Sequence, residues 1–598
     1  MEVFISMSSY LEKLKSCTSI SDLISEFQMK ISPRQFGYIV YGLSDAEKYQ
    51  CFTIPKKSGG DRIIQSPNSS LKEIQRKIAD ILMHCISEIK KKNHNYLRCN
   101  HAFECNKSIV SNAEIHRNKK FILNIDIKDF FDSIHYGRIK GFFVSDSYFS
   151  LNENVARIIA KSATCNGFLP QGSPLSPVIS SLIGNLIDVR FLKLAKKYRF
   201  SYSRYADDIT LSSNEDLSPS LIYWDELNNV WKITNVIDSL IKESGFKINH
   251  KKTRYNRYSS RQIVTGIVVN RKRNVTSEYR RENRAMVHSL LQTGKFYISN
   301  ITGEKVEGSI NQLIGRINHC IYVKYYYPKF HLELDQDVRN KHKKDKRDEL
   351  IQLISSSYMK KGDLSSFSDH QMYLLRSTLF YKYFLGISET TIYPEGHTDD
   401  VYFKLAARKL NITNIKIKRI NNSLRKLGLT GGTPKIYNFL NTLLRAQEKG
   451  FLNYGNINIK AEKPAIFILD YDDGLDSLSN FFSKINDNKS FYNVKDNIYL
   501  LLIRNKIKKI SKKESYKESN NQLCIENLLN YNGKRIEVSK DNKEKVIFNG
   551  NNMSKSIFSM YVSKNQDIFD FSQFQSLFHQ ISLIEDDYKK LIKKVAIQ

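Results

Sequence analysis

Hydrophobic and polar positions change their spacing several times along the chain, and each spacing predicts a different kind of element. Two β-prone runs within 52–65 flank a Ser-Gly-Gly-Asp turn, which predicts a hairpin. Apolar residues at helical spacing predict a helix over 71–89, after a short helical lead-in over 1–50. From 121 to 270, β-prone runs alternate with helical stretches. This region is therefore expected to be mixed α/β.

The pattern changes after residue 320. A highly charged run over 331–348 is followed by helical spacing over 350–358 and 372–384, so we expect a helical connector over 321–385. The charged run is typical of a solvated helix face, with contact to RNA as the alternative.

A second α/β pattern begins near Glu389. It predicts a strand over 390–393, a helix over 399–410 and a fully apolar strand over 465–469. Apolar strands of that kind are typical of parallel sheets covered on both faces. We expect this domain to span 386–598, with a basic extension beyond about residue 500 whose spacing predicts little.

Length, charge and cysteine content narrow the class of protein. A chain of 598 residues should divide into more than one domain. Its 93 Lys and Arg residues against 61 Asp and Glu give a net charge of +32, which favours a polyanionic partner such as nucleic acid. Eight scattered cysteines without a Cys-x-x-Cys pair indicate neither a zinc site nor a disulfide framework. With no signal peptide or membrane-length apolar run, we expect a cytoplasmic protein without a membrane partner.

Three aspartates form the clearest chemical pattern. Asp126 ends the apolar run that starts at Phe121, and Asp207 and Asp208 occupy a predicted tight turn between two short strands. An Asp-rich surface turn could explain the pair alone, but adjacent aspartates repel each other without a cation. Three carboxylates at strand ends can hold two Mg²⁺ ions for in-line phosphoryl transfer.

These residues and their neighbours resemble, in order and spacing, the reverse transcriptase family over about 50–320. The resemblance implies a right-hand fold of fingers, palm and thumb over 1–320, with Asp126, Asp207 and Asp208 as catalytic, metal-binding residues. It implies deoxynucleoside triphosphate (dNTP) substrates, with Phe131 as the steric gate and Lys252 able to protonate the leaving pyrophosphate. The residues expected to contact the nucleotide are Lys56, Arg62, Phe131, Gln171 and Lys252.

Two short strings resemble signatures of retron reverse transcriptases. One is Asn-Ala-x-x-His and the other is Val-Thr-Gly. The resemblance implies that a structured non-coding RNA is copied into 2′-5′-branched single-stranded DNA, the multicopy product called msDNA. The residues expected to contact RNA or primer are Asn112, His116, Val264, Thr265 and Gly266. Taken alone, His116 is better explained as a structural histidine than as a catalyst.

A second set of acids follows the predicted strands of the C-terminal domain. Glu395 follows one strand, and Asp470 and Asp472 follow another, at the functional edge of an open α/β sheet. This set could bind Mg²⁺ and leave Glu395 as a general acid or base. It resembles the TOPRIM domain of topoisomerases, primases and certain nucleases. Asp399 is either a further ligand or a helix first-turn residue, and incidental acids in a Rossmann-like domain remain the alternative.

The whole chain thus resembles a retron reverse transcriptase fused to a Rossmann-like TOPRIM domain, an α/β and α+β multidomain protein. The resemblance implies an antiphage effector: a Mg²⁺-dependent nuclease restrained by the RNA–DNA product. The nuclease would act on a nucleic acid, and tRNA is one candidate for that target. A second copy of the chain is a further candidate partner. The alternatives are a C-terminal domain that only binds nucleic acid or assembles subunits, and polymerase motifs kept only for RNA binding.

Overall fold

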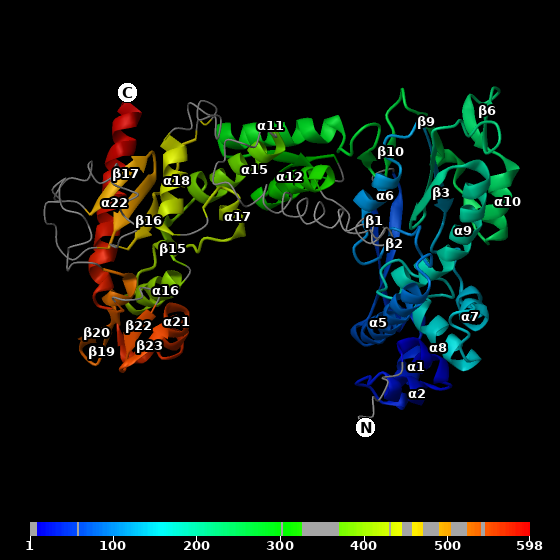
Figure 1. Cartoon of the computed structure of the whole chain (residues 1–598), viewed down its shortest axis with the longest axis horizontal. Coiled ribbons are helices and arrows are strands. Elements are labelled where there is room, and N and C mark those ends of the chain that lie inside the picture. Colours follow the sequence, from blue (N-terminus) through cyan, green and yellow to red (C-terminus); the bar gives the residue numbers. More distant parts are fainter. Residues whose placement is uncertain are drawn as a thin grey trace, which may run out of the picture. The chain divides into compact units, whose positions relative to one another are not determined.

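The computed structural model describes most of the chain and divides it into two compact units (Figure 1). The described residues are 9–56, 59–300, 303–325, 370–396, 398–429, 432–444, 457, 459–470, 490–503, 523–539 and 545–597. The first unit comprises residues 9–279 with 322–325, and the second comprises 280–321 with the described residues from 370 onward.

The first unit combines short N-terminal helices, a finger-like hairpin and a central antiparallel sheet. Its helices are α1 (Tyr10–Ser16), α2 (Ile20–Glu26), α3 (Pro33–Gly37), α4 (Asp45–Lys48), α5 (Ser69–Lys92), α6 (Ile109–Ile115), α7 (Tyr136–Ser145), α8 (Glu153–Ala163), α9 (Ser176–Tyr198) and α10 (Asn235–Glu243). Its strands are β1 (Tyr49–Pro55), β2 (Asp61–Pro67), β3 (Phe121–Lys128), β4 (Ser201–Tyr205), β5 (Asp208–Ser213), β6 (Ile222–Asp225), β7 (Val230–Ile233), β8 (Lys247–Ile248), β9 (Arg254–Arg257), β10 (Ile263–Val264) and β11 (Ile267–Val268).

Local sequence explains where the N-terminal helices begin. Ser9, Ser19, Ser32 and Ser44 each cap a helix, and a Glu, Asp or Gln three residues later completes each capping box. The predicted lead-in is thus a set of short capped helices. The predicted hairpin is β1–β2, paired from Tyr49↔Pro67 to Pro55↔Asp61, and the predicted helix over 71–89 lies within α5. These predictions are confirmed.

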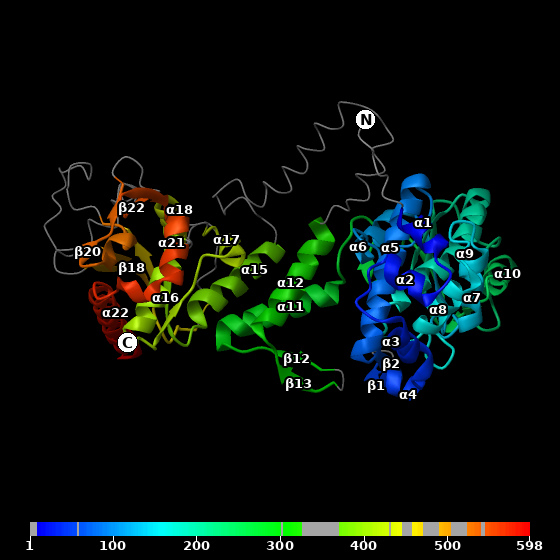
Figure 2. The ribbon, with the colours of Figure 1, turned by 90° about the horizontal axis from the view of Figure 1, so that it is seen from below.

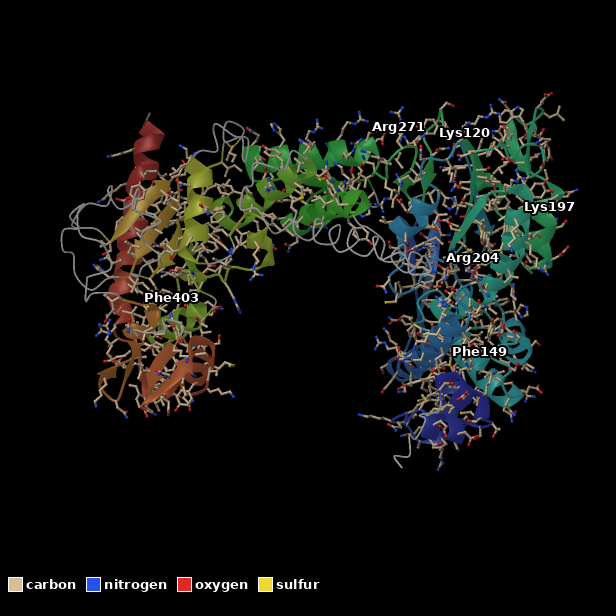
Figure 3. All side chains as sticks on the ribbon, in the orientation of Figure 1. Lys120, Phe149, Lys197, Arg204, Arg271 and Phe403 are labelled. Carbon is tan, nitrogen blue, oxygen red and sulfur yellow. The ribbon has the colours of Figure 1, made fainter. Side chains whose placement is uncertain are left out.

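The central sheet of the first unit has the strand order β4-β5-β3-β8, with β9 also pairing with β3. Its apolar residues join those of α5, α7, α8 and α9 in one core, in which Phe149 is fully buried (Figure 3). Asp126 lies near the carboxyl end of β3, and β5 begins at Asp208. The sheet therefore brings carboxylates that are about eighty positions apart in the sequence to one edge.

The second unit is built around a different sheet. Its helices are α11 (Ser277–Thr293), α12 (Ile310–Tyr325), α15 (His370–Phe380), α16 (Asp399–Lys409), α17 (Asn422–Arg425), α18 (Thr433–Leu444), α21 (Lys555–Lys564) and α22 (Phe574–Ile597). Its strands are β12 (Tyr297–Ser299), β13 (Lys305–Glu307), β14 (Thr390–Pro394), β15 (Ile415–Ile417), β16 (Ala465–Leu469), β17 (Phe491–Lys495), β18 (Ile498–Leu502), β19 (Asn530–Tyr531), β20 (Lys534–Arg535), β21 (Glu537–Val538), β22 (Lys545–Phe548), β23 (Asn551–Ser554) and β24 (Phe569–Asp570).

The main sheet of this unit has the order β15-β14-β16-β18-β17, and only β17 runs antiparallel to its neighbour. Successive residues of β16 alternate between two cores. Phe467 belongs to the core shared with α15 and α18, whereas Ile466 and Ile468 belong to the core shared with α16, α21 and α22. The apolar run over 465–469 is thus buried on both faces, as its sequence predicts.

Helices α11 and α12 share a hydrophobic core with α15 and lie beside it in both ribbon views (Figures 1 and 2). Leu290, Leu313 and Leu375 are buried in this core. The predicted domain boundary at residue 320 falls after α11 and within α12. The predicted helix over 372–384 corresponds to α15 and the π-helix Tyr381–Leu385, while that over 350–358 lies outside the described residues.

Within the described part of the chain, no helix is both long and apolar enough to cross a membrane. Beyond residue 500, where the sequence predicts little, the described residues form short strands together with α21 and α22, and these pack on one face of the main sheet.

Candidate active sites

Asp126, Asp207 and Asp208 meet at one edge of the central sheet. Asp126 and Asp208 are directly opposite each other in the β3–β5 register, and Ile127 N–H donates to the Asp207 carbonyl over 3.0 Å. Ala206, between β4 and β5, has a φ of +57° and makes the turn. Burial and the neighbouring Asp207 and Asp126 raise the pKa of Asp208 to about 6, and burial also raises the pKa of Asp207. Carboxylates that repel each other in this way fit a divalent cation.

Lys252 and Asn249 hold the two oxygens of Asp126. Lys252 Nζ lies 3.0 Å from Asp126 Oδ2, and Asn249 Nδ2 donates to Oδ1 over 2.9 Å. The hydrogen bond to Asp126 raises the pKa of Lys252, so the ammonium stays protonated. A protonated lysine beside the carboxylates suits the predicted role of acid toward pyrophosphate. Sequence analysis gave Asn249 no role, although it lies three residues before Lys252.

A buried ion pair supports the catalytic turn from behind. Arg204, on β4, and Asp188, on α9, are both almost fully buried, and Arg204 makes two 2.8 Å contacts to the Asp188 carboxylate. Arg204 also donates to the carbonyl of Ala206 over 3.1 Å, while Tyr202 donates to Asp188 over 2.6 Å. This network fixes the turn that carries Asp207. Sequence analysis missed it because a lone Arg and a lone Asp in amphipathic elements carry no signal of burial.

The other residues expected to contact the nucleotide lie on the β1–β2 hairpin, in the loop after β3 and in the loop before α9. Lys56 and Arg62 are exposed on the β1–β2 hairpin. Burial raises the pKa values of Asp132 and Asp207, and the positive charges of Lys56 and Arg62, respectively, offset a small part of that rise. The carbonyl of Gln171 accepts a 2.7 Å hydrogen bond from Gln65 N–H, which joins its loop to β2. A Cβ on the next residue, Gly172, would lie 2.9 Å from the Gln65 carbonyl, so only glycine allows this approach.

Phe131, the expected steric gate, is half-buried and lies edge-on to Phe130 with ring centroids 5.7 Å apart. Phe130 in turn stacks on Phe246 at 5.3 Å. The buried Phe130 ring therefore holds the half-buried Phe131 ring in place. A steric gate needs such support, because its side chain must not move aside when a nucleotide binds.

Asn112 and His116 are fully buried and tie α6 to the central sheet. The His116 ring nitrogens lie 2.7 Å from the hydroxyls of Ser203 and Ser212, and Ser203 donates to Asn112 over 2.6 Å. These side chains do not face solvent, so the predicted RNA contact does not fit their burial. The Asn-Ala-x-x-His string instead encodes a buried polar network that joins α6 to β4 and β5.

The Val-Thr-Gly string forms the tight turn between β10 and β11. Val264 is buried, and Thr265 and Gly266 have φ values of +45° and +80°. A positive φ is unusual for a β-branched residue; Thr265 is held there by a 3.1 Å hydrogen bond from its hydroxyl to the Ile109 carbonyl of α6. Both retron-like strings therefore meet at α6. Contact of Thr265 or Gly266 with a primer stays a prediction.

In the second unit, Glu395 and Asp470 follow the parallel strands β14 and β16. Glu395 accepts hydrogen bonds from the backbone and hydroxyl of Thr433, and Asp470 N–H donates to it over 3.3 Å. Asp399 is buried, and its carboxylate accepts a 2.7 Å hydrogen bond from Gly396 N–H. The charge of Asp399 also raises the pKa of Asp470, so Asp399 belongs to the same group of buried acids. Asp472 lies outside the described residues.

Glu526 and Lys555, for which the sequence predicts no role, complete this cluster. Glu526 is fully buried, its Oε1 has no hydrogen-bond partner among the described residues, and its Oε2 lies 3.2 Å from Lys555 Nζ. Asp470, Cys524 and Glu526 each offer a ligand atom, with these atoms within 4.8 Å of one another. Cys524 therefore belongs to a group of residues that could hold a metal ion, although the sequence contains no Cys-x-x-Cys pair to indicate a zinc site.

The charges of this cluster do not balance. Glu395, Asp399, Asp470 and Glu526 supply four carboxylates. Within the described part of the unit, Lys555 is the cation that contacts Glu526, and its charge also acts on Asp399 and Asp470. Burial raises the pKa values of Asp399, Asp470 and Glu526, and the carboxylates raise one another's further. Buried carboxylates of this kind become stable when they bind cations. We call these four carboxylates with Lys555 the second acidic cluster.

Comparison with known proteins identifies the first unit. A sequence model of the family described as reverse transcriptase (RNA-dependent DNA polymerase) matches residues 54–269. The chain is 29% identical to the retron Mx65 reverse transcriptase of Myxococcus xanthus over 40% of its own length and 55% of that protein. It is 30% identical to the retron Ec86 reverse transcriptase of Escherichia coli over 43% of its own length and 74% of that protein.

The relative from retron Ec73 of Escherichia coli is also 30% identical, over 43% of this chain and 80% of that protein. The chain thus spans about half to four-fifths of the length of these relatives. Among solved structures, a Candida albicans telomerase in complex with a telomeric RNA fragment aligns with a TM-score of 0.29 and 13% identity. The alignment covers 55% of this chain and 62% of that one. By the match to its relatives and the ordered palm carboxylates, this chain belongs to the retron reverse transcriptase family.

Proposed function

We propose that the first unit is the RNA-directed DNA polymerase of a retron, which copies a non-coding RNA into branched single-stranded DNA from dNTPs. The observation that carries this is the meeting of Asp126, Asp207 and Asp208 at one sheet edge, beside Lys252. Bound Mg²⁺ would offset the carboxylate charge and activate the attacking hydroxyl. Lys56 and Arg62 would bind the triphosphate, and Lys252 would donate a proton to pyrophosphate.

The polymerase proposal is tested on nucleic acid that copurifies with the chain expressed beside its non-coding RNA. Sequencing should find DNA branched from RNA with the native chain. That DNA should be absent with Asp208→Asn and present with Asp238→Asn, which alters a half-buried aspartate of the same unit paired to Lys242. Bound RNA without DNA from the native chain would show that the motifs serve RNA binding alone.

We propose further that the second unit is a TOPRIM-type, Mg²⁺-dependent nuclease and the effector of antiphage defence. The unbalanced charge of the second acidic cluster supports this, together with its position at the carboxyl ends of β14 and β16. Glu395, Asp399, Asp470 and Glu526 would hold the cation, and Lys555 would offset charge that develops on a phosphodiester. In this proposal the RNA–DNA product restrains a toxin whose target is cellular nucleic acid, with tRNA as the first candidate.

Glu395→Ala tests the effector separately from the polymerase. The variant should lose Mg²⁺-dependent cleavage of RNA and phage resistance while its yield of branched DNA stays unchanged. Glu537→Gln, at an exposed carboxylate of the same unit, is the matched control and should retain both activities. Full phage resistance in the Glu395→Ala strain would instead support a second unit that binds nucleic acid or assembles subunits without catalysis.

A further inference from the structure

A pocket of about 420 Å³ lies between α11 and α15 of the second unit, separate from both sets of carboxylates. Its floor is apolar and buried, formed by Val287 and Leu291 of α11 and Leu374 of α15. The two helices share one hydrophobic core, which fixes the walls of the pocket. They lie side by side in both ribbon views (Figures 1 and 2).

The rim of the pocket is cationic. Arg281, Arg284 and His288 are exposed and lie three and four residues apart on α11, so they share one face of that helix. No acidic side chain is among the described residues that line the pocket. Such a rim attracts an anion, and guanidinium groups suit the paired oxygens of a phosphate.

The opposite wall is aromatic. His370 and Tyr373, one turn apart on α15, have ring centroids 6.0 Å apart and planes inclined by 26°. Flat rings above an apolar floor offer a stacking surface to a nucleobase, whatever its sequence. Phosphate-binding and base-stacking groups therefore flank the same small volume.

We propose that this pocket binds one nucleotide of single-stranded DNA, with its base against the floor and the aromatic wall and its phosphates on Arg281 and Arg284. A single strand is required because a paired base cannot enter a pocket. We name DNA rather than RNA because the proposed polymerase makes single-stranded DNA, so this choice of strand rests on the proposed function. The second unit thereby holds DNA at a place of its own, whether or not the second acidic cluster is a nuclease.

Photo-crosslinking of the full-length chain tests the pocket directly. A short single-stranded DNA that carries one 5-iododeoxyuridine is irradiated with the chain in the presence of a chelator, and crosslinked peptides are mapped by mass spectrometry. We expect a crosslink at His370 or Tyr373. It should persist in Arg408→Ala/Arg425→Ala, which removes two exposed charges elsewhere in the unit, and disappear in Arg281→Ala/Arg284→Ala.

Salt dependence gives a second, quantitative readout. Because each phosphate contact to a single strand contributes about 0.7 to the slope of log affinity against log salt, the Arg281→Ala/Arg284→Ala variant should lower that slope by about 1.4. The control double variant should leave it unchanged. Crosslinks confined to other sites, or an unchanged slope in the pocket variant, would overturn the proposal. Preferential crosslinking of the matching 5-iodouridine RNA would overturn the assignment to DNA.

Discussion

Arg204 and Asp188 form a bidentate ion pair in the interior of the first unit, with both nitrogen–oxygen distances at 2.8 Å and both residues at most 1% exposed. The pair lies directly behind the turn that carries Asp207, because Arg204 also donates to the Ala206 carbonyl. Loss of either partner leaves a charge buried without compensation, which is the costly case for ion pairs.

Asp188→Asn should therefore destabilise the first unit by about 3–5 kcal/mol and abolish DNA synthesis. Urea unfolding followed by tryptophan fluorescence measures this, because both tryptophans of the chain, Trp224 and Trp231, lie in the first unit. Glu153→Gln, which disrupts an exposed pair with Lys140 and Arg157, should leave the free energy of unfolding almost unchanged, because solvent screens exposed ion pairs. Equal effects of the two variants would contradict the supporting role of Asp188.

Gly184 of α9 should be intolerant of a methyl group. A Cβ there would lie 2.5 Å from the guanidinium carbon of Arg204, so Gly184→Ala must displace the buried ion pair. We expect Gly184→Ala to lower the free energy of unfolding by about 1–3 kcal/mol in the same measurement. Gly141→Ala, in the exposed part of α7, meets no atom within 4 Å and should stabilise the unit by up to about 1 kcal/mol. Stabilisation by both substitutions would show that the Arg204 side chain can move without cost.

His116 should make the first unit sensitive to acid. Burial, with a smaller effect from Lys119, lowers the pKa of His116 to about 3, from an ordinary value of 6.5. Below pH 6.5 the unfolded chain binds a proton that the folded chain does not, so stability present above that pH is lost as pH falls toward about 3.

The test compares the free energy of unfolding of the native chain and His116→Gln from about pH 7.5 to about pH 5. Below pH 6.5 the native chain should lose up to about 1.4 kcal/mol per pH unit more than the variant. Parallel pH profiles for the two proteins would mean that His116 is protonated in the folded chain.

Glu526 should determine how much divalent cations stabilise the second unit. If it is a ligand, Glu526→Gln removes one repelling carboxylate, so the thermal midpoint of the second unit should rise in chelator. The stabilisation by saturating Mn²⁺ or Mg²⁺ should shrink, because a weaker site gains less from the same ion concentration. If Glu526 serves only as the partner of Lys555, the midpoint in chelator should fall and the response to the ions should stay as in the native chain.

Several elements and sites could be predicted from the sequence because their signals are local. Capping boxes, the β1–β2 hairpin, the apolar strand β16 and the turn at Asp207 each depend on a few neighbouring residues. Asp126, Asp207 and Glu395 could likewise be singled out, since a carboxylate at a strand end is visible in one short window of sequence.

Other features depended on the tertiary structure. Glu526 lies more than one hundred positions after Glu395, and Lys555 begins a helix of its own, so neither has a local pattern that marks it as buried. The same applies to the Arg204–Asp188 pair.

The retron-like strings show most clearly what the sequence predicts and what only the tertiary structure decides. The sequence by itself determined that Asn112 and His116 belong to a recognisable pattern, whereas the packing of α6 on β4 and β5 decided that they bind serine hydroxyls in the interior. Likewise, the helical spacing of Arg281, Arg284 and His288 is present in the sequence, but their pocket exists only because α15 packs beside α11. Residue type sets what a side chain can bind, and burial and distant neighbours, which depend on the whole chain, decide what it does bind.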